Sequence, residues 1–391
     1  MTPPLPRRNP ADSPRRTPSG FTLIELLVVI LIIGILLALL IPAVAAAVKA
    51  AKNAQVGAEI SNITTALADF KNKYGEYPPS RIILHNSGDY NPTNATQLFG
   101  AGDITVGDLN QRTARAMKKF FPRAGAFFNT SGSGGTTFPW DGTTGTAAAN
   151  YVVLQGHECL VFFLGGIPSA TPDGNGGFTY AMTGFGKDPV NPFNPQSPNR
   201  NVPLYEFSPS RLQDINNFTS PSNGGPNGFP SYVDPVSGTT APRPYAYFSS
   251  YGNNGYDPND DNSGGYGNRN AGGTLFPDSL ETDDSGNVLF RIFHVNFPVV
   301  PITSGATNAA SSTAPNPYTT GDPTNAKAGW INPQTFQLLS AGVDGQWGLG
   351  GGYEPNSTTR LPAYASDSAA IPALRKRESD NISNFANGKL D

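Results

Sequence analysis

Residues Ser19 to Ile30 read Ser-Gly-Phe-Thr-Leu-Ile-Glu-Leu-Leu-Val-Val-Ile, and the apolar character of this stretch continues as far as Val48. No charged side chain occurs between Glu25 and Lys49, which leaves a run of 23 uncharged residues. A helix of that length crosses the ~30 Å of hydrocarbon in a lipid bilayer. The stretch therefore predicts a membrane-spanning helix.

Glu25 is the unusual residue of this span, because a carboxylate in lipid is costly, on the order of 3 kcal/mol at the bilayer centre. We expect a positive charge to neutralise it. The alternative is that Glu25 lies near the membrane edge and extends its side chain to the headgroups.

The box Gly20-Phe21-Thr22-Leu23-Ile24-Glu25 in front of an apolar helix resembles the leader of type IV pilins and type II secretion pseudopilins. The resemblance implies that a prepilin peptidase cuts between Gly20 and Phe21 on the cytoplasmic side and methylates the new N-terminal residue. The mature chain would then have 371 residues, with Glu25 in fifth position. Because cleavage creates an ammonium group at Phe21, the carboxylate of a neighbouring subunit's Glu25 can pair with it in a low dielectric.

Two other export signals must be weighed against this interpretation. A secretory signal peptide also has a basic front, but its apolar region usually has only 7 to 15 residues. An uncleaved anchor would need neither Gly-Phe at the boundary nor an acid four residues later. In each case the excess of arginines before the span keeps the N-terminus in the cytoplasm and places the body of the protein outside. We therefore expect a single-pass protein of the bacterial inner membrane with a periplasmic or surface head.

The composition limits which partners and which kind of fold the rest of the chain can have. The formal net charge of -3 gives no reason to expect a nucleic-acid partner. The 391 residues include 44 glycines and 37 prolines, which together favour long loops around a modest core. The single cysteine, Cys159, excludes a disulfide within the chain, so we expect packing, with a bound metal ion as a further option, to hold the head together.

These features predict an α+β protein with a long N-terminal helix on a small antiparallel sheet, interrupted by long loop insertions. We divide it into a cleaved leader (1–20), a transmembrane assembly helix (21–48), an amphipathic continuation with its exit (49–79), a loop-rich head (80–334) and a pseudopilin-like C-terminal region (335–391).

Pro42 lies inside the predicted helix and removes one backbone donor, so we expect a kink or a locally opened turn there. Pilins carry a proline at the matching place, and the resemblance implies a turn that melts when subunits pack. The alternative is a proline that the membrane helix tolerates without any function.

The amphipathic continuation carries an apolar stripe at four- and three-residue spacing, which is typical of one helix face: Val56, Ile60, Ile63, Leu67, Phe70 and Tyr74. Polar residues are expected on the other faces: Lys52, Asn53, Gln55, Glu59, Asn62, Asp69 and Lys71. Gly75 predicts the end of the helix. The run Tyr74 to Pro78 resembles the helix exit of major pseudopilins.

In the head we predict two helices and four strands. The helices are Asp108 to Phe121, capped by Asp108, and about Ala148 to Leu164, with Cys159 as a small buried hydrophobe. The strands are Val202 to Phe207, Tyr245 to Ser250, Val288 to Phe297 and Thr335 to Leu339, with a hairpin turn at Asp284 to Asn287.

The C-terminal region contains a second recognisable motif, Ser340-Ala-Gly-Val-Asp344-Gly, followed by glycines and later by Asp380-Asn-Ile. It resembles the end of major pseudopilins, which in that family folds around calcium. The resemblance implies Asp344 and Asp380 as side-chain ligands, with carbonyls near Leu339 or Gly342 completing the shell. Two departures weaken the match: an insertion at 353–378 separates the aspartates, and Asp-Asn replaces an acidic pair. The alternative is a glycine-rich turn with surface aspartates.

Other candidate sites are weak. The acidic run 257–264 lacks the glycine and the glutamate of an EF-hand and is better explained as a solvated turn. His85, His157 and His294 form no metalloprotease motif, and neither a nucleophile elbow nor a phosphate loop is present. We therefore expect a protein that is not an enzyme.

Together these patterns predict a structural subunit of a type II secretion pseudopilus or a type IV pilus-like filament. Its expected partners are prepilin peptidase, further subunits, and an inner-membrane platform with an assembly ATPase. The alternative is a membrane-anchored binding or enzymatic head that uses the pilin-type leader only for export.

Overall fold

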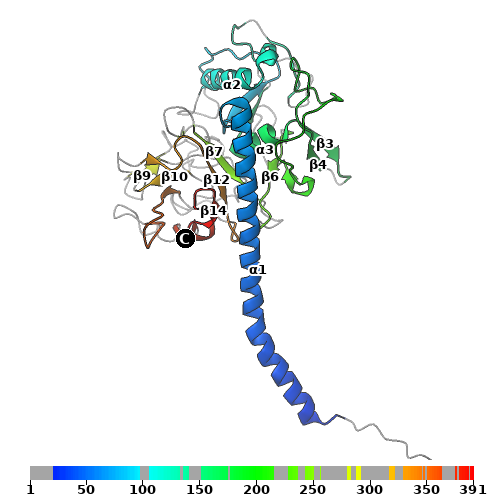
Figure 1. The fold of residues 1–391 in the computed structure, drawn as a ribbon, viewed down its shortest axis with the longest axis vertical. Coiled ribbons are helices and arrows are strands. Elements are labelled where there is room, and N and C mark those ends of the chain that lie inside the picture. The colour runs from blue at the N-terminus through cyan, green and yellow to red at the C-terminus, as the bar shows by residue number, and fades with distance from the viewer. Residues whose placement is uncertain are drawn as a thin grey trace, which may run out of the picture. The chain divides into compact units, whose positions relative to one another are not determined.

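The structure is a computed structural model (Figure 1). It describes the following residues: 21–96, 105–132, 135–140, 151–174, 177–214, 228–236, 243–250, 256, 280–282, 288–291, 317–321, 329–345, 347, 350–362, 375–376, 378–386 and 388–391. The chain divides into two compact units, Met1–Ala50 and Ala51–Asp391.

The long helix α1 runs from Leu23 to Tyr74 and has 52 residues. Its length of about 78 Å follows from a rise of 1.5 Å per residue. The helix is continuous through Pro42, so the expected opening of a turn does not interrupt it. A kink at this position stays a prediction.

The second part of α1 forms its apolar stripe as predicted. Ile63, Leu67 and Phe70 are buried, and the ring of Phe70 contacts Phe120 and Phe163 edge-on at centroid distances of 5.1 and 5.7 Å. Such edge-to-face pairs add stability beyond the apolar area that they bury. The stripe is therefore the face on which the head packs.

Gly75 ends α1, as its sequence position predicts. Its φ of +87° lies in the left-handed region, and its N–H donates to the carbonyl of Lys71 at 2.7 Å. This geometry satisfies a carbonyl at the end of the helix that would otherwise lack a partner.

Helix α2, Val106–Phe120, confirms the first helix of the head but corrects its cap. The hydroxyl of Thr105 accepts a hydrogen bond from the backbone N–H of Asp108 at 3.0 Å, and Thr105 is therefore the N-cap. Asp108 lies one turn inside, where its carboxylate accepts from the Thr105 hydroxyl. The 3-10 helix η1, Pro122–Phe127, follows.

The predicted helix 148–164 was wrong in its first part. Residues Tyr151–Leu154 form strand β2, which pairs antiparallel with β1, Ile82–His85. Helix α3 covers only Gly156–Gly165, and Cys159 is buried within it as expected. The side chain of Glu158 accepts the N–H of Gln155 at 2.8 Å and so fixes the start of α3.

The largest described sheet has four antiparallel strands in the order β15-β14-β12-β7. Their bounds are Gly388–Lys389, Ile382–Ser383, Phe336–Ser340 and Ala246–Ser249. Strands β12 and β7 confirm two of the four predicted strands.

Smaller sheets complete the head. Pairs form between β3 (Pro168–Pro172) and β4 (Phe178–Met182), between β5 (Leu212–Gln213) and β6 (Ser231–Tyr232), and between β8 (Leu280–Thr282) and β9 (Val288–Arg291). Strand β10 (Tyr318–Thr320) lies between β11 (Gly329–Trp330) and β13 (Gly351–Gly352), the latter parallel to it.

Two further predictions need comment. The segment 202–207 is not a strand: Val202 is 88 % exposed, whereas Leu204, Tyr205 and Phe207 pack against the core. Strand β9 matches the start of the predicted strand 288–297, whereas the rest of it, the turn 284–287 and the acidic run 257–264 lie outside the described residues.

Candidate assembly helix and its anchorage

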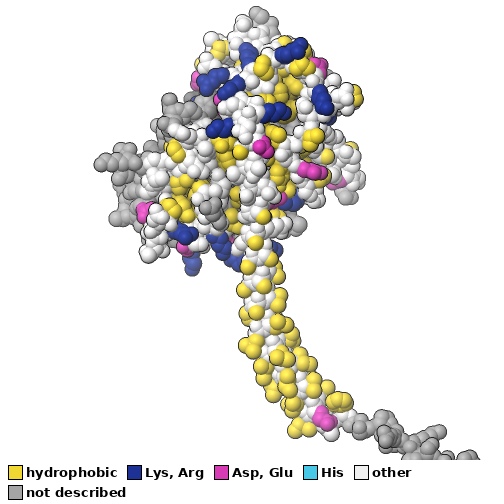
Figure 2. All heavy atoms as spheres, viewed as in Figure 1, with side chains coloured by type: hydrophobic (Ala, Val, Ile, Leu, Met, Phe, Trp, Pro, Cys, Tyr) yellow, Lys and Arg dark blue, Asp and Glu magenta, His cyan; other side chains and the backbone are white. Residues whose placement is uncertain are grey.

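The first half of α1 exposes its whole apolar surface. Every large hydrophobic side chain from Phe21 to Val48 is exposed, with Phe21 at 81 %. Figure 2 shows hydrophobic side chains covering the visible face of this segment. Among the described residues α1 is the one helix long and apolar enough to cross a membrane, and an 18-residue window within it has a mean hydropathy of 3.3. A monomer in water does not expose so much apolar surface, so lipid or other subunits must cover it.

Glu25 has a local role that the sequence interpretation missed. Its Oε2 accepts hydrogen bonds from the backbone N–H of Thr22 at 2.8 Å and from the Thr22 hydroxyl at 2.7 Å. The hydroxyl of Thr22 in turn accepts from the N–H of Glu25 at 3.3 Å. Thr22-Leu-Ile-Glu25 is therefore a capping box, and its Thr-x-x-Glu spacing was the signal for it.

This arrangement leaves Glu25 able to meet a second group. No ion pair of Glu25 is found within residues 21–96 or the other described parts of the chain, and its Oε1 makes no hydrogen bond there. Phe21, whose nitrogen becomes charged if the chain is cut before it, is the first described residue. Gly20 lies outside the described residues, and Pro42 lies within the exposed apolar part of α1.

Glu59 is the main polar anchor of the second part of α1. The prediction placed it on an outward face, but its side chain is only 13 % exposed. Arg211 is the last residue of the 3-10 helix η2, Pro209–Arg211. Its guanidinium donates to both oxygens of Glu59 at 2.7 Å. The same guanidinium donates to the carbonyl of Val233. This bidentate geometry joins two segments that are 152 residues apart.

Three tyrosine hydroxyls complete the anchor. Tyr245 donates to Glu59 at 2.5 Å, Tyr232 at 2.9 Å and Tyr205 at 3.4 Å. Burial raises the pKa of Glu59, but hydrogen bonds from Arg211 and Tyr245 and the charge of Arg211 outweigh it, so the pKa lies below its ordinary value. The carboxylate is therefore charged and fully bonded at neutral pH.

The structure brings the two candidate calcium segments together without building a calcium cage from the described residues. Asp344 is exposed, while Asp380 is 7 % exposed and its Oδ2 accepts the N–H of Val343 at 3.2 Å. Gly342, with φ of +69°, packs directly against the backbone of Asp380. Leu339 lies in β12 with strands on both sides. The described residues contain no group of three or more potential metal-binding side chains.

Arg375 places a buried positive charge in this region. Arg375 is 5 % exposed and donates to the carbonyls of Gly350 and Gly352 and to the carboxylate of Glu378. Glu378 also accepts from the Tyr318 hydroxyl at 2.9 Å. Carbonyl and carboxylate oxygens are the ligands that calcium prefers. In this structure these oxygens instead accept hydrogen bonds from the guanidinium of Arg375. Calcium binding thus stays a prediction that depends on the resemblance alone.

The two histidines within the described residues have structural surroundings. Nε2 of His85 lies 2.7 Å from Oδ1 of Asn110, and burial lowers the pKa of His85 to about 4. Nδ1 of His157 lies 2.7 Å from the hydroxyl of Ser231. His294 lies outside the described residues.

Comparison with known proteins adds one match. Residues 15–41 match the family model of the prokaryotic N-terminal methylation motif. No curated protein and no solved structure matches the chain. The match covers Gly20, Phe21 and Glu25 and extends into the exposed apolar part of α1. The chain therefore carries a type IV pilin-like leader at the start of its apolar helix, the arrangement of a membrane-anchored, single-pass protein.

Proposed function

We propose that the protein is a structural subunit of a type II secretion pseudopilus or a type IV pilus-like filament. Prepilin peptidase removes residues 1–20 and methylates Phe21. Before assembly, the mature subunit resides in the inner membrane with its head outside the cytoplasm. The platform and the assembly ATPase then draw it into the filament. Its function is mechanical support of secretion and involves no catalysis.

The observation that carries this proposal is the exposed apolar half of α1. In the membrane, lipid covers these side chains. In a filament, the same side chains pack against the helices of other subunits, so the apolar surface stays out of water in both states. A helix that serves only as a membrane anchor needs to be covered by lipid but not by the helices of other subunits.

Glu25 then sets the register between subunits. The capping box with Thr22 fixes the position of its carboxylate at the helix start, and Oε2 receives both hydrogen bonds. The ammonium group of a neighbouring subunit's N-terminus pairs with this carboxylate where water is excluded. There the attraction between the two charges is much stronger than in water.

Intact-mass spectrometry of the protein from membranes tests the processing step. We expect a chain that lacks 20 residues and carries one methyl group on Phe21. Replacing Gly20 by a bulky residue should leave the precursor uncut. A mature N-terminus at Phe21 in that variant would contradict the assignment to prepilin peptidase.

A further inference from the structure

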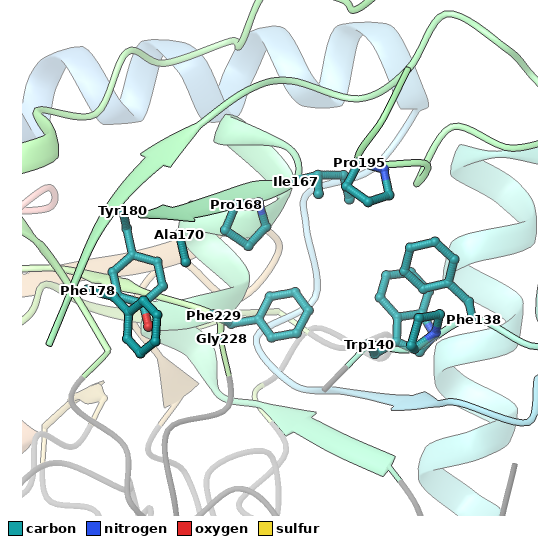
Figure 3. Close-up of a pocket in the computed structure, with 11 residues that line it drawn as sticks. Phe138, Trp140, Ile167, Pro168, Ala170, Phe178, Tyr180, Pro195, Gly228 and Phe229 are labelled. Carbon is teal, nitrogen blue, oxygen red and sulfur yellow. The ribbon is translucent and has the colours of Figure 1, made fainter. Parts of the chain in front are cut away.

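The head contains an apolar pocket of about 470 Å³ that has no part in the proposed assembly function. Loop 138–140, strands β3 and β4, and Phe229 form its walls (Figure 3). In the figure, Phe138 and Trp140 lie at one end, Phe178 and Tyr180 at the other, and Phe229 between them.

The chemistry of the walls defines what the pocket can hold. Among the described residues that line it, none is charged and five are aromatic. The Tyr180 hydroxyl already donates to Asp214 at 3.3 Å. Most of the rings are buried, but Phe178 is 51 % exposed and stands at the rim. A charged ligand would lose its hydration here and gain no partner in return.

The size and polarity favour a small molecule over a peptide. Small-molecule sites typically have volumes of about 300 to 1,000 Å³ and mostly apolar walls. A peptide strand needs partners for its backbone N–H and C=O groups. Three of the lining residues, Pro139, Pro168 and Pro195, have no backbone N–H to offer.

We infer that this pocket binds a neutral, ring-bearing apolar small molecule. The aromatic side chains at its two ends hold the ligand's rings by edge-to-face and offset contacts. Ala170 on β3 contributes a short side chain to the wall, beside Tyr180 (Figure 3). The site is independent of the apolar helix and of Glu25.

Photolabelling with benzophenone, a neutral molecule with two aromatic rings, tests this inference on the full-length protein in detergent. Peptide mapping by mass spectrometry separates labelling of the pocket from labelling of the membrane helix. We expect adducts on the peptides that contain residues 167–180 and 229. Excess naphthalene should suppress these adducts at least tenfold, whereas decane should not.

Two neighbouring exposed positions of β3 give matched variants. Ala170→Trp fills the pocket and should abolish its labelling. Thr171→Trp places the same indole on the other face of the strand and should leave labelling unchanged, because side chains alternate along a strand. Absence of adducts from the pocket of the natural protein, equal labelling of both variants, or competition by decane alone would each overturn the inference.

Discussion

The guanidinium of Arg211 donates one hydrogen bond of 2.7 Å to each carboxylate oxygen of Glu59. Glu59 belongs to the helix that would enter a filament, whereas Arg211 belongs to the head. The ion pair is mostly shielded from water, with 13 % of the Glu59 side chain and 20 % of the Arg211 side chain exposed. The ion pair therefore joins the second part of α1 to the head.

Removing one partner of this pair should destabilise the head strongly. We expect Glu59→Ala to lower the free energy of unfolding by about 3 kcal/mol, since an unpaired guanidinium and three tyrosine hydroxyls stay behind. Asp69→Ala, on an exposed position of the same helix, should change it by less than about 0.5 kcal/mol. Chemical denaturation followed by tyrosine and tryptophan fluorescence provides the comparison. Equal effects of the two substitutions would show that the anchor contributes little.

Much of α1 could be predicted from sequence because local rules determine it. The unbroken apolar run, the stripe from Val56 to Phe70 and the stop at Gly75 each depend on residues within a few turns. The Glu59 anchor could not be predicted in this way. Its partners lie 146 to 186 residues further along the chain, and no local pattern marks a carboxylate beside the stripe as buried.

The errors in the head have a similar cause. A short apolar run such as Tyr151 to Leu154 suits a buried strand and a buried helix equally well, so periodicity could not separate β2 from α3. The Gln155–Glu158 hydrogen bond marks the true helix start, but glutamine is not a typical cap residue. Val202 to Phe207 has strand-forming residues and no strand to pair with among the described segments.

The pH dependence of stability should contain two opposing contributions. Burial lowers the pKa of His85 to about 4. The stability that neutral His85 contributes to the folded state is therefore present above the ordinary pKa of 6.5 and is lost as pH falls toward 4. Burial raises the pKa of Asp234 to about 6, despite hydrogen bonds from Ser340 and Val236. Its contribution is present below its ordinary pKa of 3.8 and is lost as pH rises through 6.

Single substitutions separate the two contributions. We compare the free energy of unfolding of each variant with that of the natural protein at the same pH. For His85→Gln the variant should be relatively more stable at pH 5 than at pH 7. For Asp234→Asn the variant should be relatively more stable at pH 7 than at pH 5. Each difference should be on the order of 2 kcal/mol. Urea unfolding at the two pH values measures it. A difference of the same sign in both variants would contradict the assignment.

The buried arginine of the C-terminal region predicts a weak response to calcium. Arg375→Met leaves Glu378 and two glycine carbonyls without their charged donor and should lower the melting temperature by several degrees. Lys376→Met, at the exposed neighbouring position, is the control. Replacing calcium by EGTA should change the melting temperature of the natural protein by less than the substitution Arg375→Met does.

The opposite result has a clear meaning as well. A rise of several degrees with calcium that disappears in Asp344→Asn and Asp380→Asn would establish the calcium site that the family resemblance implies.

Two substitutions at the helix start separate charge from capping. Thr22→Ala removes the capping box and keeps the carboxylate of Glu25, so we expect fewer filaments but not their loss. Thr22→Ser restores the hydroxyl and should recover the natural amount. The number of filaments is counted by electron microscopy of cells that express equal amounts of each variant. No difference between alanine and serine would show that capping is irrelevant to assembly.

The charge of Glu25 is the central claim, and Glu25→Gln tests it most directly. Glutamine keeps an oxygen that accepts the Thr22 hydrogen bonds but cannot form an ion pair with the neighbouring N-terminus. We predict that this variant is inserted and processed at natural levels, with a mature N-terminus at Phe21, and that electron microscopy finds no filaments. Filaments of normal number and length from the processed Glu25→Gln protein would contradict the account.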